Sequence, residues 1–199
     1  MTARFVVLEG GEGCGKSTQA ARLAASLGAL LTREPGDTAI GARLRELLLD
    51  PATEAGPVTE ALLMAADRAE HVARVIRPAL DSGQHVVCDR YVGSSVAYQG
   101  HGRGLDVDRI VGTSAWATGG LEPDLVVLLE VPAAVAAERL GTDLDRFESA
   151  GEGFHDRVRE GFVAQAEADP DRWVRVDGNR PLDEVSASVL SAVRERLGL

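Results

Sequence analysis

A glycine-rich segment near the start of the chain constrains its fold more than any other feature of the sequence. Residues 9–18 read EGGEGCGKST, and Gly10, four further residues and Gly15-Lys16-Ser17 match the phosphate-loop pattern G-x-x-x-x-G-K-[ST]. Glycines let successive backbone N–H groups turn toward one phosphate, while the lysine reaches the outer phosphates and the serine hydroxyl ligates Mg²⁺. A predicted strand at Phe5–Glu9 precedes the segment and a helical repeat at Ser17–Leu27 follows it, which is the order that aims a helix N-terminus at an anion. The sequence therefore predicts a nucleotide-binding loop; the alternative is a glycine-rich turn that only joins a strand to a helix.

The charge composition supports a site for an anionic small molecule. The chain has 21 Lys and Arg residues and a formal net charge of −10, and its only lysine is Lys16, where a compact point charge is wanted. A negative protein repels nucleic acid and anionic membranes, so we expect neither as a partner and expect local arginine clusters to bind the ligand. The sequence has no apolar run of about 18 residues, no signal-peptide pattern, and only Cys14 and Cys88 as cysteines. We therefore expect a cytoplasmic protein with a single domain over residues 1–199.

Short apolar runs separated by helical repeats predict an α/β protein. The predicted strands are Phe5–Glu9, Ala29–Thr32, His85–Asp89, Leu125–Val131 and Trp173–Val176. The predicted helices are Ser17–Leu27, Ala39–Leu49, Thr59–Leu80, Asp106–Thr118, Pro132–Leu140, His155–Ala168 and Leu182–Leu197, with a further turn or two over Gly93–Gln99. Strands buried on both faces with helices between them indicate a five-stranded parallel sheet covered by helices on both faces, in the three-layer fold typical of phosphate-loop NTP hydrolases. Ligands of such sheets bind beyond the carboxyl ends of the strands.

Polar residues follow two of the predicted strands. Arg33 and Glu34 come directly after the second strand and precede the turn signal Pro35-Gly36. Asp89 ends the third strand, where an acid beside a phosphate loop holds Mg²⁺ or its water, and Arg90 follows it. We expect both pairs to line the site. The alternatives are a solvated turn for the first pair and an ion pair without ligand for the second.

Three further segments carry candidate ligand contacts. Met64 and Arg68 share one face of a predicted helix, where they could bracket a planar ligand, although spacing alone favours the rim of an amphipathic helix. Residues 91–100 gather hydroxyl and amide side chains of the kind that orient a polar small molecule. Residues 141–153 are polar and glycine-punctuated, which indicates either an exposed loop or a mobile lid with Arg139 and Arg146, whose cations would close over developing charge.

Together these segments resemble the thymidylate kinases, within the nucleoside monophosphate kinases, over nearly the whole chain. The family's E-G-x-[DE]-G-x-G-K-[ST]-T loop corresponds to Glu9–Thr18 and its T-R-E-P-G turn to Thr32–Gly36. Its L-L-F-x-A-x-R helix corresponds to Leu62–Arg68 with one change, its D-R-Y-x-x-S-x-x-A-Y-Q-G segment to Asp89–Gly100, and its D-R-[IF]-E lid sequence to Asp145–Glu148. The last two segments are far more specific than the phosphate loop, which many unrelated ATPases and GTPases share.

The resemblance implies phosphoryl transfer from ATP to dTMP, with Mg²⁺, by a homodimer. The implied ATP-binding residues are Gly10, Gly11, Glu12, Gly13, Cys14, Gly15, Lys16, Ser17, Thr18 and Arg139, with the Asn179-Arg180 loop a further candidate beside adenine. The implied dTMP-binding residues are Glu12, Arg33, Pro35, Met64, Arg68, Arg90, Ser95, Tyr98 and Gln99. The implied Mg²⁺ ligands are Ser17, directly, and Asp89, through water, and the implied catalytic residues are Lys16, Asp89, Arg90 and Arg146. The resemblance also implies that Glu12 accepts a hydrogen bond from the 3′-hydroxyl, Arg68 bonds a thymine carbonyl and Tyr98 disfavours a 2′-hydroxyl.

Two positions depart from the family pattern. Met64 stands where the family usually has a phenylalanine that stacks on thymine, which predicts either dTMP binding weaker by about 0.5–1.5 kcal/mol or a compensating aromatic side chain elsewhere. Some members have an arginine at the position of Cys14, and those without it supply one from the lid, which here offers chiefly Arg146. Arg146 is therefore predicted to neutralise the transition state, and Arg146→Ala to lower kcat by about 100-fold or more.

Other functions on the same fold remain alternatives at this stage. One is a different pyrimidine nucleotide or deoxynucleoside kinase, and another is an interaction domain that binds nucleotide without turnover. A GTPase switch reads guanine with [NT]-K-x-D, and the single lysine of this sequence already lies in the phosphate loop.

Overall fold

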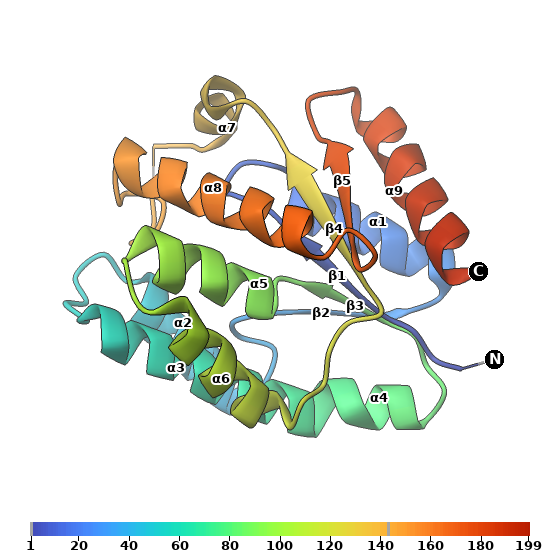
Figure 1. The fold of residues 1–199 in the computed structure, drawn as a ribbon, viewed down its shortest axis with the longest axis horizontal. Helices are drawn as coiled ribbons and strands as arrows, with labels where there is room; N and C mark the ends of the chain where they lie inside the picture. Colours follow the sequence, from blue (N-terminus) through green and yellow to red (C-terminus); the bar gives the residue numbers. More distant parts are fainter. Residues whose placement is uncertain (1, 143) are drawn as a thin grey trace.

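A five-stranded parallel sheet forms the centre of the computed structural model, which describes residues 2–142 and 144–199 (Figure 1). The strands are β1 (Phe5–Glu9), β2 (Leu30–Arg33), β3 (Val86–Asp89), β4 (Leu125–Glu130) and β5 (Trp173–Asp177), in the spatial order β2-β3-β1-β4-β5. Every predicted strand is present, and each predicted boundary is correct to within one residue. The predicted parallel α/β architecture is confirmed.

Helical segments connect the strands and cover the sheet. They are α1 (Lys16–Leu27), α2 (Ala39–Leu49), α3 (Pro57–His71), η1 (Val72–Ile76), α4 (Arg77–Asp81), α5 (Val92–Ser95), η2 (Val96–Gly102), α6 (Val107–Thr118), α7 (Ala133–Arg139), α8 (Glu152–Ala168) and α9 (Leu182–Leu197), where η marks a π-helical segment. Among the described residues, none of these helices is long and apolar enough to cross a membrane.

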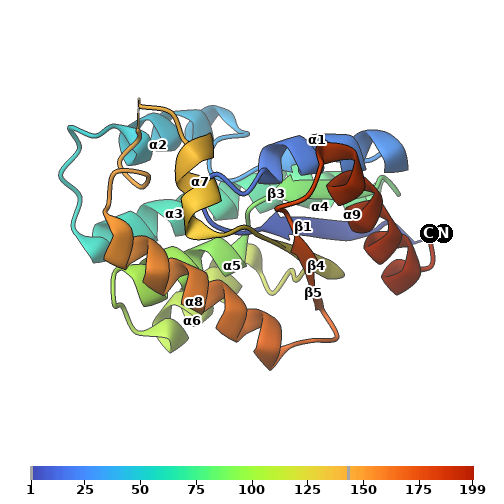
Figure 2. The same cartoon turned by 90° about the horizontal axis from the view of Figure 1, so that it is seen from above.

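Alternation along the central strands divides the core into two faces. Val6 and Leu8 of β1 belong to a cluster that packs against α1 and α9, while Phe5 and Val7 face a second cluster beneath η1 and α4. Side chains of successive strand residues point to opposite faces, so continuous apolar runs such as Phe5–Leu8 must be covered on both sides. Figure 2 shows α1 and α9 on one side of the sheet and α5, α6 and α8 on the other. The three-layer arrangement follows from this pattern.

Two predicted helices take a different form in the structure. The single helix expected over Thr59–Leu80 is divided into α3, η1 and α4. Pro78 has no N–H to donate to the carbonyl four residues earlier, which accounts for a wider turn just before it. The short helical turn expected at Gly93–Gln99 extends through α5 and η2, and it brings Ser95, Tyr98 and Gln99 to the inside of the molecule.

The strand register brings the candidate residues to one edge of the sheet. Leu8 of β1 pairs with Asp89 of β3, and Arg33 of β2 pairs with the same Asp89. The phosphate loop therefore begins beside Asp89 and the turn after β2, although these segments are far apart in the sequence. Parallel strands place all their carboxyl ends at one edge, which is why the site forms there.

Candidate active site

The phosphate loop joins β1 to the first turn of α1. Gly10 has φ 144° and Gly13 has φ 69°, in the region that side chains rarely adopt. A Cβ at Gly10 would lie 2.5 Å from the Leu129 carbonyl oxygen, and one at Gly13 would lie 2.5 Å from that of Ala136, so neither position accepts another residue. No described side chain caps the first turn of α1, whose N–H groups are therefore open to an anion.

Lys16 crosses the phosphate loop from the start of α1. Its side chain is buried, and Nζ donates to the Gly11 carbonyl oxygen at 2.6 Å and lies 3.6 Å from the Cys14 sulfur. The ammonium group of the only lysine in the sequence is thus held at the inner wall of the loop, where its charge would act on a bound phosphate with little screening.

Ser17 and Asp89 form an oxygen-only pair beside the loop. Ser17 Oγ donates to Asp89 Oδ2 at 2.5 Å, and Asp89 Oδ1 is buried with no hydrogen-bond partner among the described residues. This donor set suits Mg²⁺, which prefers oxygen ligands and keeps several waters. The described residues contain no cluster of three or more His, Cys, Asp or Glu side chains suited to a metal. Nucleotide phosphates and water would therefore complete the coordination.

Arg90 connects the phosphate loop to a second cavity. Its guanidinium donates to Glu12 Oε1 at 2.6 Å, to the Gly10 carbonyl oxygen at 3.2 Å and to Ser94 Oγ at 3.1 Å. Tyr98 donates to the same Glu12 oxygen at 2.7 Å. Burial opposes ionisation of Glu12, but Arg90 and Lys16 outweigh it and lower the pKa of Glu12 to about 2. Arg90 thus pairs with Glu12 and Asp89 with Ser17, rather than with each other.

The second cavity contains most of the residues implied to bind dTMP. Its wall includes Glu12, Pro35, Met64, Arg68, Arg90, Ser95, Tyr98 and Gln99. Arg68 is 2% exposed and donates to Glu34 at 2.7 Å, to Ser95 Oγ at 3.1 Å and to the Tyr91 carbonyl oxygen at 3.0 Å. The interpretation of Arg68 as part of a solvated helix rim is therefore wrong.

Arg45 is a cation of this wall that no sequence motif indicated, whereas Arg33 lies outside the wall in the described chain. The Arg33 side chain is half-exposed and pairs with Asp37, and Arg45 donates to the Pro35 carbonyl oxygen at 2.8 Å. Burial lowers the pKa of Arg45, and the charges of Arg33 and Arg90 lower it further. Three guanidiniums that repel one another favour a bound anion. The available signal was helical spacing, because Arg45 shares a face of α2 with the buried Gly41 and Leu48.

The two arginines assigned to the lid region have different surroundings. Arg139 donates to the Gly178 carbonyl oxygen at 3.2 Å and to that of Gly13 at 3.5 Å, so it joins the phosphate loop to the segment after β5. Arg146 donates instead to the buried Glu60 at 2.7 Å and to the Leu48 carbonyl oxygen at 2.8 Å. Within the described part of the chain it lies in neither cavity wall. Its predicted role at the transferring phosphate stays a prediction.

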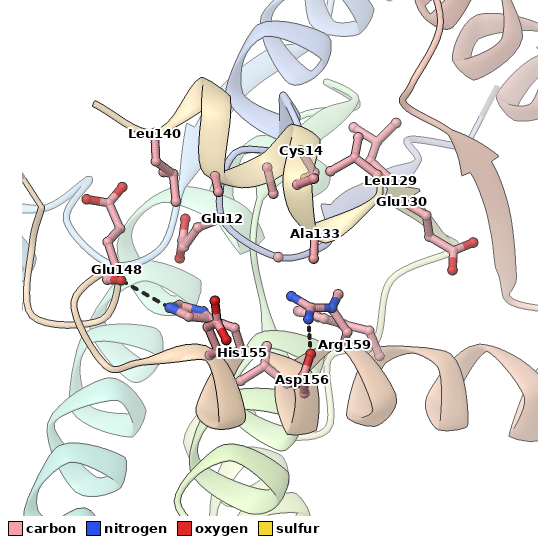
Figure 3. Close-up of a pocket in the computed structure, with 18 of the residues that line it drawn as sticks. Glu12, Cys14, Leu129, Glu130, Ala133, Leu140, Glu148, His155, Asp156 and Arg159 are labelled. Carbon is pink, nitrogen blue, oxygen red and sulfur yellow. Dashed lines mark hydrogen bonds and ion pairs between the residues drawn. The ribbon is translucent and has the colours of Figure 1, made fainter. Parts of the chain in front are cut away.

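A larger cavity of about 700 Å³ lies beneath α7 (Figure 3). Its walls come from the phosphate loop, the end of β4, α7 and α8, and the four alanines of α7 leave much of the space. Figure 3 shows Glu12 on one side and His155, Asp156 and Arg159 of α8 on the other, with Arg159 paired to Asp156. Glu12 lines both the second cavity and this larger cavity, so the two cavities meet at this residue.

Comparison with known proteins identifies the family. The family model described as thymidylate kinase matches residues 8–189. The chain is 49% identical to thymidylate kinase of Deinococcus radiodurans, covering 96% of this chain and 97% of that one. It is 51% identical to thymidylate kinase of Synechococcus sp. strain JA-3-3Ab, covering 97% and 96%. The crystal structure of thymidylate kinase from Ehrlichia chaffeensis matches with a TM-score of 0.80 at 28% identity, covering 98% of this chain and 100% of that one. The chain therefore belongs to the thymidylate kinase family, which phosphorylates dTMP to dTDP.

Proposed function

We propose that the chain transfers the γ-phosphoryl group of ATP to dTMP, with Mg²⁺, between the phosphate loop and the cavity around Arg68, Arg90 and Tyr98. The observation that carries the proposal is the position of Arg90. Its guanidinium donates to the Gly10 carbonyl oxygen of the phosphate loop and also lies in the wall of the second cavity, which we call the acceptor cavity. A cation at this junction can contact the donor and the acceptor phosphates at once, as phosphoryl transfer requires.

The chemistry needs alignment and charge neutralisation more than a protein nucleophile. The attacking oxygen of a nucleoside monophosphate is already largely anionic, so little general-base assistance is needed. In this proposal Lys16 follows the transferring group, Arg90 bridges the two phosphates and Arg45 holds the acceptor phosphate. Ser17 would ligate Mg²⁺ directly and Asp89 through water, and the ion would neutralise charge on the ATP phosphates.

The acceptor cavity offers polar groups for a pyrimidine deoxynucleotide. Arg68 is fixed by Glu34 and Ser95, and its buried guanidinium can bond a base carbonyl. Tyr98 is held against Glu12 by its hydroxyl, close to where a deoxyribose would lie. We propose that Tyr98 disfavours a 2′-hydroxyl and that Glu12 accepts a hydrogen bond from the 3′-hydroxyl.

A panel of acceptors tests the proposal. ADP release would be measured with ATP, Mg²⁺ and each of dTMP, dUMP, dCMP, CMP and thymidine. We expect the highest kcat/KM for dTMP. A preference for CMP or for a nucleoside would indicate a different kinase on this fold, and zero turnover with bound ATP would indicate an interaction domain.

We also propose that the protein works as a homodimer through α3 and α6. These helices pack side by side, and their exposed apolar side chains include Val58 and Leu62 on α3 and Val111 on α6, with Trp116 87% exposed. Exposed apolar side chains on adjoining helices are typical of a contact surface. Light scattering should give a dimer mass for the wild type and a monomer mass for Trp116→Lys. A monomeric wild type at micromolar concentration would contradict the dimer.

We place the protein in the cytoplasm. Cys14 and Cys88 are both free and buried, which is compatible with a reducing compartment. Cell fractionation of the native host would test this placement.

A further inference from the structure

Glu60 is a fully buried carboxylate that the phosphoryl-transfer chemistry does not use. It lies in the first turn of α3 and is 0% exposed. Its oxygens accept hydrogen bonds from Gln99 Nε2 at 2.9 Å, from Arg103 Nη2 at 3.0 Å and from Arg146 Nη1 at 2.7 Å. One carboxylate therefore joins α3 to the acceptor cavity, through Gln99, and to the segment between α7 and α8, through Arg146.

Both arginines of this cluster are held in place by other contacts. The Arg103 guanidinium lies 4.4 Å from the centre of the Phe154 ring, and that of Arg146 lies 4.7 Å from the centre of the Phe147 ring. Buried ion pairs contribute little net stability, because desolvation offsets the attraction, so a cluster of this kind is better explained by the geometry that it enforces. The geometry enforced here includes the orientation of one amide.

Glu60 determines which end of the Gln99 side chain faces the cavity. A carboxylate between two guanidiniums only accepts hydrogen bonds, so the amide must turn its NH₂ group toward Glu60. Gln99 is 1% exposed yet lines the acceptor cavity, and its Nε2 is directed to Glu60, which leaves the carbonyl oxygen as the other end of the amide. The Gln99 carbonyl oxygen is thereby presented to a ligand as an acceptor.

We propose that Glu60 is a positioning residue that sets base selectivity by fixing the orientation of the Gln99 amide. This inference rests on the proposed function, because it concerns the base bound in the same cavity. Thymine offers an N–H donor at N3, which complements a carbonyl acceptor, whereas N3 of cytosine is itself an acceptor and is repelled. A site with a fixed acceptor rejects the wrong base because two acceptors face each other without a proton.

Glu60→Gln tests the inference with almost no change of volume. A glutamine has both a donor and an acceptor end, so Gln99 can turn either way against it. We expect the ratio of kcat/KM for dTMP to that for dCMP to fall at least about 10-fold, with most of the change in KM for dTMP. The KM for ATP and the kcat for dTMP should stay within about threefold. Where turnover of dCMP is too slow to measure, the inhibition constant of dCMP as a competitor of dTMP is compared between the wild type and the variant instead of kcat/KM.

Matched variants separate positioning from a structural role. Glu70→Gln, on the same helix in a partly exposed pair with Arg74, is the control and should leave the ratio unchanged. Gln99→Met should lower the ratio by itself, and adding Glu60→Gln to it should change the ratio no further. If Glu60→Gln does not fold, Gln99→Met still tests the inference, because an unchanged ratio in that variant would overturn it.

The outcomes are distinguishable. A folded Glu60→Gln protein with the wild-type ratio, an equal loss for every acceptor, or a Gln99→Met protein with the wild-type ratio would each overturn the inference. A wild type that does not prefer dTMP would instead contradict the proposed function.

Discussion

Replacement of Arg146 tests whether this side chain holds the fold or neutralises the transition state. The family resemblance predicts a loss in kcat for Arg146→Ala, whereas the contacts in the structure predict a loss of stability. Arg146 donates to the buried Glu60 at 2.7 Å and to the Leu48 carbonyl oxygen at 2.8 Å, and its side chain is only 11% exposed. The alanine variant would leave the Leu48 carbonyl unpaired and Glu60 with one guanidinium in place of two.

The magnitude follows from these two contacts. A buried charge-assisted hydrogen bond contributes about 1.5–3 kcal/mol, and an unpaired buried carbonyl costs about 1 kcal/mol or more. Arg103 remains on Glu60 and limits the loss to the lower part of the range for breaking a buried ion pair. We expect a destabilisation of about 3 kcal/mol, or a fall in Tm of about 6–12 °C for a chain of this size.

Thermal and urea unfolding would be measured together with kcat at saturating ATP and dTMP, well below the Tm of the variant. We expect the stability loss above and a change in kcat of less than about 10-fold. Arg146→Lys should recover part of the stability, since it restores one donor to Glu60. A Tm within 2 °C of the wild type together with an approximately 100-fold fall in kcat would refute the structural reasoning and support the role implied by the resemblance.

Three further predictions concern the acceptor cavity and the sheet. Met64→Phe should lower the KM for dTMP by about two- to tenfold, because Met64 lines the cavity and a phenyl ring stacks better on thymine; an unchanged or higher KM would argue against stacking there. Arg45→Met should raise the KM for dTMP by about 10-fold with a smaller change for ATP, and a matching change for ATP would place Arg45 on the donor phosphates instead. Burial raises the pKa of Glu9 to about 7 from 4.5, although Ser94 and Arg90 oppose the shift. A raised carboxyl pKa means that the folded state loses stability as pH rises from 4.5 to 7. In urea unfolding, the free energy of unfolding of Glu9→Gln should therefore rise by about 2–3 kcal/mol relative to that of the wild type between pH 5 and pH 8. A pH-independent difference would show that Glu9 has an ordinary pKa.

Local patterns in the sequence determined the elements of the fold. Apolar runs between helical repeats gave the strands to within one residue, and they required a parallel sheet with two covered faces. The phosphate loop was equally local, because its glycine spacing acts through backbone conformation rather than distant contacts. Asp89 ends a predicted strand of a parallel sheet and Arg90 follows it, so their position at the carboxyl edge of the sheet also followed from the sequence.

Contacts between distant segments decided the details of the site. Glu60 meets Arg146 across 86 positions in the chain, and no pattern within either segment shows that this carboxylate holds that guanidinium. The sequence placed Arg33 in the site and gave Arg45 no role, but the turn after β2 directs Arg33 to Asp37 while Arg45 of α2 lies in the cavity wall. The direction of a charged side chain depends on which partner the folded chain brings within a few ångströms, so tertiary structure alone could assign these residues.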